Sequence, residues 1–177
     1  MPKFKYVFQP DKADWRELLD KVLAANPGAV VVAADALTSA KIVGRLQDRG
    51  YQGLLFAGPT AGRRAFRTEA GSAADNVVFP SLLTATENNF ATRFREHYGY
   101  APDYATTCSH DAVAMLIAAV RKGGLNRAKI GDAVRSLSPY QGLTGTIHWD
   151  PLGCNQRPVS LSTYRHGHTE PVDLLPN

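Results

Sequence analysis

The run Ala29-Val30-Val31-Val32-Ala33-Ala34 decides the fold class of this sequence. It is apolar throughout, and it is bounded by Asn26-Pro27-Gly28 on one side and by Asp35 on the other. A continuous apolar run between such breakers is typical of a central parallel strand, because a strand that is buried on both faces needs no polar side chain. The run therefore predicts a strand in the middle of a parallel sheet.

Helical patterns lie on both sides of this strand. Before it, apolar residues recur at helical spacing from Trp15 to Leu23, and Asp11 is the expected N-cap. After it, a helix is expected from Thr38 to Arg49, and Gly50 stops it. Further strands are expected at Lys5–Phe8, Leu54–Ala57 and Asn76–Phe79, and a short helix at Arg63–Glu69. This alternation predicts an α/β fold with right-handed crossovers, in which a Rossmann-like, mostly parallel sheet is flanked by helices.

The second half of the sequence is mainly helical. Apolar residues at Phe90, Phe94 and Tyr98 mark a helix that ends at Gly99. Ser109 is the expected N-cap of the next helix, whose residues 112–120 are apolar on almost every side and are therefore expected to be buried on nearly every side. A third helical stripe runs from Ile130 to Leu137, and two strands are expected at Thr146–Trp149 and Val159–Tyr164. Added to the α/β unit, these elements make an unbalanced arrangement, which indicates that part of the fold is missing.

Composition and charge exclude several classes of protein. The 177 residues are 44% hydrophobic and 20% charged, which is typical of a globular domain and excludes a disordered, collagenous or disulfide-scaffold chain. No apolar run approaches the roughly 20 residues that span a bilayer, and residues 1–6 lack the apolar core of a signal peptide, so we expect neither in this chain. Lys and Arg number 20 against 16 Asp and Glu, an excess too small and scattered to predict nucleic-acid binding. The basic cluster Arg63-Arg64 with Arg67 is interpreted as the solvated face of a helix.

The sequence also lacks the motifs of the common enzyme classes. It has no nucleotide-binding glycine loop, no nucleophile elbow and no metalloprotease helix, so we expect no catalytic activity and no cofactor. His166 and His168 lack a third ligand, so no metal site is expected. Asp111, at an expected helix start, is interpreted as a favourable partner of the helix dipole. Cys108 and Cys154 permit a disulfide but do not have the spacing of metal ligands.

Two loops form the candidate binding site, because ligands of open parallel sheets bind beyond the carboxyl ends of the strands. Ala34 and Asp35 follow the Val-rich strand, and Thr60 and Ala61 follow the next strand along the chain. Asp35 is the only charged residue at a strand end in this half. Its carboxylate suits either of two roles: it accepts hydrogen bonds from a ligand ammonium, amide or hydroxyl group, or it caps the helix that follows.

A series of short segments points to a known family. They read DW at 14–15, ANPGAVV at 25–31, GYQG at 50–53, FAGP at 56–59, GSAADNV at 71–77, FREHYGYAPD at 94–103, DAV at 111–113 and QGLTGTIHWDPLG at 141–153. In this order they resemble the Leu/Ile/Val-binding protein family, the type I periplasmic substrate-binding proteins of branched-chain amino acid ABC transporters. His110 stands where the Y-D-A-V pattern of the family has Tyr. The similarity extends from about Asp11 to Gly167.

The resemblance implies a partial fold. Family members have two Rossmann-like lobes joined by hinge strands, and this chain resembles the second half, so the first lobe is missing. Residues 1–80 then form a lobe-two-like α/β unit, residues 81–141 a helical segment that normally returns to lobe one, and residues 142–177 the C-terminal strands and tail. The apolar helix lacks its usual cover, so we expect a homodimer, formed through a two-fold interface or by exchange of the helical segment.

The resemblance carries over few binding residues. In amino-acid-binding members an aromatic residue of lobe two packs on the ligand and a Glu pairs with its ammonium group. The matching positions here are Asp35 and Thr60, and both depart from the pattern. The acid is lost at Thr60, whereas Asp35 supplies a charge from the neighbouring loop. The ligand is therefore expected to be an amino acid or a related small polar solute whose identity the sequence leaves open.

The leading hypothesis is a non-enzymatic, solute-binding domain. It captures its ligand in an interlobe cleft, by lobe closure, and delivers it to an ABC permease. The resemblance implies an extracytoplasmic or periplasmic location. The alternative is a sensor domain of the same fold that regulates a kinase or a transcription factor, and the lack of a signal peptide in this chain keeps a cytoplasmic sensor open.

Overall fold

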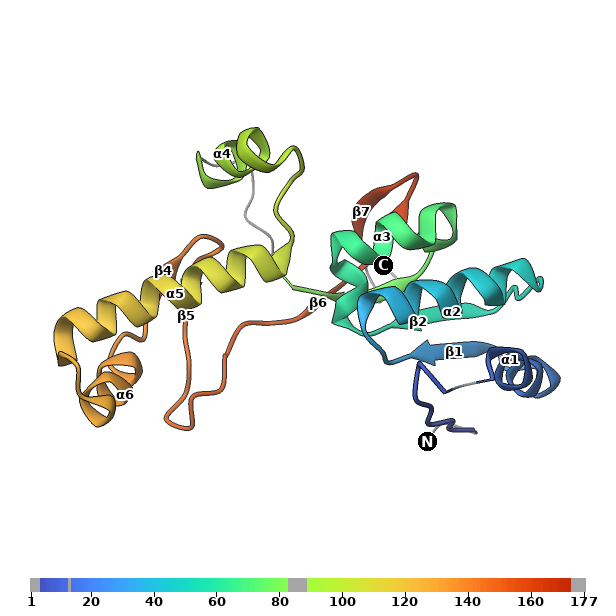
Figure 1. The fold of residues 1–177 in the computed structure, drawn as a ribbon, viewed down its shortest axis with the longest axis horizontal. Coiled ribbons are helices and arrows are strands. Elements are labelled where there is room, and N and C mark those ends of the chain that lie inside the picture. Colours follow the sequence, from blue (N-terminus) through green and yellow to red (C-terminus); the bar gives the residue numbers. More distant parts are fainter. Residues whose placement is uncertain (1–3, 13, 83–88, 173–177) are drawn as a thin grey trace, which may run out of the picture. The chain divides into compact units, whose positions relative to one another are not determined.

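The computed structural model describes residues 4–12, 14–82 and 89–172, and the chain forms two compact units (Figure 1). Unit 1 consists of Met1–Ser81 and Ser160–Asn177, and unit 2 of Leu82–Val159. The C-terminal segment 142–177 is thus shared between the units: its first residues belong to unit 2, and its last strands complete the sheet of unit 1.

Unit 1 is a mixed α/β unit around a five-stranded sheet of order β1-β2-β3-β6-β7. Strands β1, β2 and β3 are parallel, and β6 and β7 form an antiparallel hairpin that pairs with β3. In chain order its elements are α1 (Trp15–Ala24), β1 (Ala29–Val32), α2 (Ala36–Asp48), β2 (Leu54–Ala57), η1 (Pro59–Gly62), α3 (Arg64–Ala70), η2 (Gly71–Ala74), β3 (Val78–Ser81), β6 (Ser160–Arg165) and β7 (His168–Val172). The predicted α/β fold with a parallel sheet and flanking helices is confirmed.

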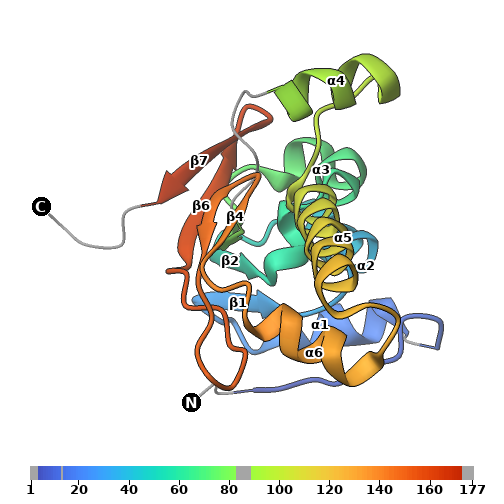
Figure 2. The ribbon, with the colours of Figure 1, turned by 90° about the vertical axis from the view of Figure 1, so that its left-hand side faces the viewer.

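The core of unit 1 lies between the sheet and its helices. Figure 2 shows α2 and α3 together on one side of these strands. On that side Val32, Leu55 and Phe79 are at most 6% exposed. Tyr164 of β6 packs its ring against Phe66 and Phe79. Helix α1 joins this layer, because Arg45 of α2 lies over the Trp15 ring and Arg49 pairs with Asp20.

The prediction for the Val-rich strand was wrong in its position. β1 is the edge strand of the sheet, and Val31 is 73% exposed. The strand expected at Lys5–Phe8 is also wrong, because these residues pair with no strand within the part of the chain that the structure describes. An apolar pattern reports which surroundings a segment suits; it does not report whether the neighbouring strand is present in the chain.

Of the two predicted ends of the first two helices, one is confirmed. Gly50 has a φ of +78° directly after α2, which is the left-handed conformation expected of a helix-stopping glycine. The predicted N-cap of the first helix was wrong, however. Asp14 caps α1, and its Oδ1 accepts hydrogen bonds from the backbone N–H groups of Arg16 and Glu17 at 2.9 and 3.1 Å. Asp11 lies too far before the first turn to reach these donors.

Unit 2 is built around one long helix. Its elements are α4 (Asn89–Tyr98), α5 (Tyr104–Gly123), α6 (Arg127–Arg135), β4 (Tyr140–Gly142) and β5 (Gly145–Ile147), with β4 and β5 paired antiparallel. Asp103 caps α5, so Ser109 is an interior helix residue and its predicted capping role was wrong. The expected burial of this helix on nearly every side was also wrong. Val113, Leu116 and Ile117 are 57%, 51% and 47% exposed.

Three features bear on chemistry and location. Cys108 and Cys154 are both free, exposed thiols. Within residues 4–12, 14–82 and 89–172, no group of three or more His, Cys, Asp or Glu side chains is placed to hold a metal ion. In the same part of the chain, none of the helices combines the length and apolar character needed to cross a bilayer.

Candidate ligand-binding site

The loops after β1 and β2 lie together at one edge of the sheet of unit 1. The two strands are parallel neighbours, and their last residues, Val32 and Ala57, are in register. Their carboxyl ends therefore coincide, as in other open parallel sheets that bind ligands at this edge. The hydroxyl of Thr60 donates to the carbonyl oxygen of Ala34 at 2.8 Å and ties one loop to the other.

Asp35 is the charged group of this edge. It is exposed and N-caps α2, where Oδ1 accepts hydrogen bonds from the backbone N–H groups of Leu37 and Thr38, both at 3.0 Å. Hydrogen bonds from Thr38, first from its side chain and then from its backbone, lower the pKa of the Asp35 carboxyl. The group is therefore ionised at neutral pH. Of its two predicted roles, the structure shows the cap.

The second loop is held to the body of the unit by its backbone. Ala61 is fully buried, and its carbonyl oxygen accepts a 2.8 Å hydrogen bond from the hydroxyl of Tyr164. Thr60 and Ala34 are half-buried. The proton of the Thr60 hydroxyl is committed to Ala34, so this oxygen is left as an acceptor. Together with the Asp35 carboxylate, it forms an acceptor-rich edge that suits hydrogen-bond donors such as ammonium, amide and hydroxyl groups.

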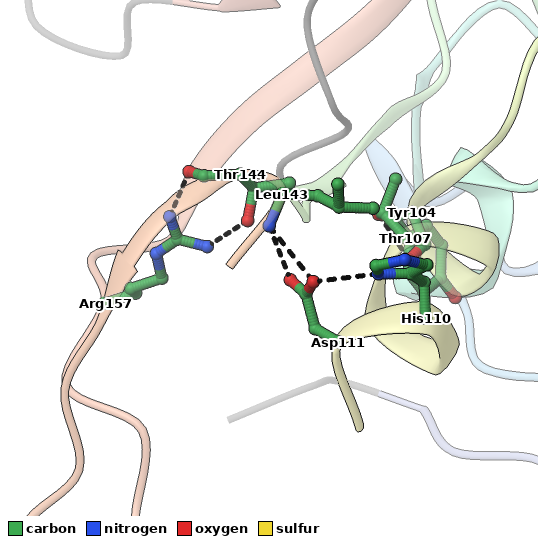
Figure 3. A network of polar contacts seen from close by, with 7 residues as sticks. All are labelled: Tyr104, Thr107, His110, Asp111, Leu143, Thr144 and Arg157. Carbon is green, nitrogen blue, oxygen red and sulfur yellow. Dashed lines mark hydrogen bonds and ion pairs between the residues drawn. The ribbon is translucent and has the colours of Figure 1, made fainter. Parts of the chain in front are cut away.

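Sequence reasoning missed a polar network in unit 2 (Figure 3). Asp111 is only 5% exposed and points to the turn between β4 and β5, where both of its oxygens accept the Leu143 N–H at 3.0 and 3.1 Å. The predicted role of Asp111 at a helix start was wrong, because α5 begins at Tyr104. The Nδ1 atom of His110 lies 3.3 Å from Asp111 Oδ1. This acid therefore joins α5 to the hairpin.

Two further contacts fix the same turn. Arg157 donates to the hydroxyl and to the carbonyl oxygen of Thr144. Gly142 lies so close to Asp111 that a Cβ atom at this position would stand 2.4 Å from Oδ2. Only glycine leaves space for the acid here. The sequence offered two signals for this contact. Gly142 and Gly145 flank the turn, and Asp111 stands directly before the apolar residues 112–120.

Unit 2 also contains an open cavity of about 860 Å³, in the size range of small-ligand pockets, between α4 and the start of α5. Its walls include the aromatic residues Phe90, Phe94 and Tyr98 together with His97 and His110. The sequence predicted these aromatic residues only as one face of a helix, and no ligand role was assigned to them.

The comparisons with known proteins agree with this architecture. A profile of the periplasmic binding protein family matches residues 5–164, so the chain belongs to that family. A search of curated proteins finds no match. The solved structures that it resembles are largely substrate-binding proteins of branched-chain amino acid ABC transporters, and the fold is theirs.

Three solved structures illustrate the likeness. A leucine-binding protein from Thermotoga maritima has a TM-score of 0.82 and 24% identity, over 96% of this chain and 51% of that one. A substrate-binding protein from Streptococcus pneumoniae, solved with isoleucine, has a TM-score of 0.75 and 23% identity over 90% and 48%. A protein described as a branched-chain amino acid ABC transporter from Rhodospirillum rubrum has a TM-score of 0.64 and 21% identity over 89% and 48%. The chain thus spans about half the length of the solved structures it matches.

Proposed function

We propose that this chain is the ligand-binding part of an ABC transporter substrate-binding protein, and that it captures an amino acid or a related small polar solute. The observation that carries the proposal is the joined edge of β1 and β2, where Thr60 is bonded to Ala34 beside the ionised Asp35. Membership of the periplasmic binding protein family and the likeness to amino-acid-binding structures support it.

The proposed binding mode assigns a role to each residue of this edge. The Asp35 carboxylate attracts a ligand ammonium or hydroxyl group, and its fixed geometry as an N-cap means that little side-chain freedom is lost on binding. The Thr60 oxygen accepts a second hydrogen bond. Ala34 lines the same edge, whereas Ala61 contributes through its backbone position because it is buried. Further contacts come from a second lobe that closes over the ligand.

The proposal is of binding without catalysis. The Thr60 hydroxyl donates to the Ala34 carbonyl and not to a general base, so it is not activated as a nucleophile. The Asp35 carboxylate accepts hydrogen bonds as the cap of α2. The ligand is then released to an ABC permease, and the family implies an extracytoplasmic site of action.

Calorimetric titration with leucine, isoleucine and a panel of polar amino acids and small hydroxylated solutes tests the proposal. Asp35→Asn removes the charge but keeps a capping side chain, so it weakens binding of the best ligand by about 1–3 kcal/mol without unfolding α2. Asp14→Asn is the matched control, because Asp14 caps α1 in the same way away from this edge. Heat that is absent for the whole panel, or equal affinity in Asp35→Asn and the parent chain, contradicts the proposal.

A further inference from the structure

The turn between α5 and α6 presents basic side chains around one apolar residue (Figure 1). Residues 121–136 contain five basic side chains and one acid. Their net charge of +4 equals that of the whole chain, so the excess of positive charge is concentrated in this part of unit 2. The exposed side chains next to the turn, which together form the α5–α6 tip, are Arg121, Lys122, Leu125, Arg127 and Lys129.

The positive charges of the tip are not neutralised within the chain. In the part of the chain that the structure describes, no acid pairs with Arg121, Arg127 or Lys129. The Nζ atom of Lys122 donates to the hydroxyl of Ser136 at 2.9 Å, and this neutral partner leaves the charge in place. The four cations of the tip are therefore available to an anionic surface.

Two of these cations stand where they oppose the dipole of α6. Arg127 and Lys129 lie in the first turn of this helix, where acids are favoured because the backbone N–H groups carry partial positive charge. Asn126 is the N-cap, and its side chain accepts the Lys129 N–H at 3.1 Å. The third residue after such a cap is favourably Glu or Gln, whose side chain completes a capping box. Helix stability therefore does not explain these two cations.

The apolar residue of the tip is held on a tight turn. A Cβ atom at Gly123 would lie 2.9 Å from the carbonyl oxygen of Lys129, so the end of α5 approaches the backbone of α6 closely here. Gly124 has a φ of +64°, and its N–H donates to the carbonyl oxygen of Val120 at 2.8 Å. Leu125 follows directly and is 97% exposed. Because the backbone is fixed beside it, little conformational freedom is lost when Leu125 leaves water.

An anionic bilayer offers both a negative surface and an apolar layer. Its headgroups attract Lys and Arg, and apolar side chains bury about 5–10 Å into the boundary between headgroups and acyl chains. The backbone of a nucleic acid offers the charge without the apolar layer. We propose that the α5–α6 tip docks on an anionic lipid surface, with Leu125 in this boundary and the four cations against the lipid phosphates. The proposal goes beyond ligand capture and does not depend on the ligand.

Sedimentation of the whole chain with vesicles tests the proposal. Vesicles of phosphatidylglycerol and phosphatidylcholine bind the chain, vesicles of phosphatidylcholine alone bind it less, and high salt releases it. Lys129→Glu lowers the partition coefficient about tenfold, because one attraction is replaced by a repulsion. The same change completes the capping box of α6, so urea unfolding shows no loss of stability. Leu125→Ser lowers the partition coefficient about threefold or more, because the apolar insertion is lost.

Lys41→Glu is the matched control. It makes the same change in net charge at an exposed residue of α2 in unit 1, so it changes vesicle binding by less than about twofold. The proposal is overturned if neutral vesicles bind as well as anionic ones, if Lys129→Glu binds as well as Lys41→Glu, or if Leu125→Ser binds as well as the parent chain. Binding of duplex DNA by a chain that does not bind anionic vesicles also overturns it.

Discussion

Replacing Asp111 by Ala is expected to loosen the hairpin of unit 2. Both oxygens of this buried carboxylate accept the Leu143 N–H, at 3.0 and 3.1 Å. The substitution removes a charged acceptor and leaves a half-buried backbone donor without it, which costs about 1–3 kcal/mol in the free energy of unfolding. Asp132→Ala is the control, because Asp132 is 77% exposed and pairs only along the helix surface. It is expected to change stability by less than about 0.5 kcal/mol.

The contact between Gly142 and Asp111 allows a second substitution to test the same role of Asp111. A Cβ atom at position 142 would lie 2.4 Å from Asp111 Oδ2, so Gly142→Ala alone is expected to destabilise unit 2 by about 1–3 kcal/mol. Once Asp111→Ala has removed the carboxylate, most of this clash is gone, and the double variant is less destabilised than the sum of the two single variants.

Urea unfolding of a Trp15→Phe background measures both effects, because Trp149 then reports on unit 2 alone. Its indole N–H donates to the carbonyl of Arg135 at 3.2 Å, so its fluorescence follows the packing of this unit. The reasoning is refuted if Asp111→Ala is no more destabilising than Asp132→Ala, or if the effects of Asp111→Ala and Gly142→Ala simply add.

Three further predictions concern other parts of the chain. Hydrogen bonds from Thr38 lower the pKa of Asp35 in the folded state. The stability that Asp35 adds over Asp35→Asn is therefore complete above about pH 4 and is lost as the pH falls through the folded-state pKa. A difference in unfolding free energy between the two chains that grows in acid would contradict this. Gly50→Ala, at a φ of +78°, is expected to cost about 1–2 kcal/mol in urea unfolding, whereas Gly44→Ala, in open space inside α2, should stabilise by up to about 1 kcal/mol. Exposed Leu116 and Ile117 on α5 should drive self-association that Leu116→Glu reduces and Leu125→Glu does not; light scattering that gives 19.2 kDa at all concentrations would show this to be wrong.

The strands and helix ends that could be predicted are those specified by neighbouring residues. The strand at Leu54–Ala57 and the stop at Gly50 depend on patterns only a few residues long, and the structure has both. The position of β1 depends instead on which strand lies beside it, and an apolar run cannot report that. The same limit applies to α5, whose apolar residues were expected to be buried by a layer that unit 2 does not supply among its described residues.

The polar contacts also differ in whether the sequence could predict them. The proximity of Ala34 and Thr60 followed from topology, because parallel neighbours end at one edge, and a hydrogen bond joins the two residues in the structure. The role of Asp111 did not follow, since its partner Leu143 is 32 residues away in the sequence. Such a pairing depends on how the hairpin docks against α5, which no local pattern encodes.

The most direct test of the central claim is a map of amide chemical shifts during titration of the labelled chain with the best ligand from the calorimetric panel. The account predicts that the amides of Asp35, Leu37 and Thr60 shift together with a single affinity, and that Asp35→Asn weakens all three responses while Asp14→Asn leaves them unchanged. Shifts confined to the aromatic cavity of unit 2, around Phe90 and His110, would contradict it.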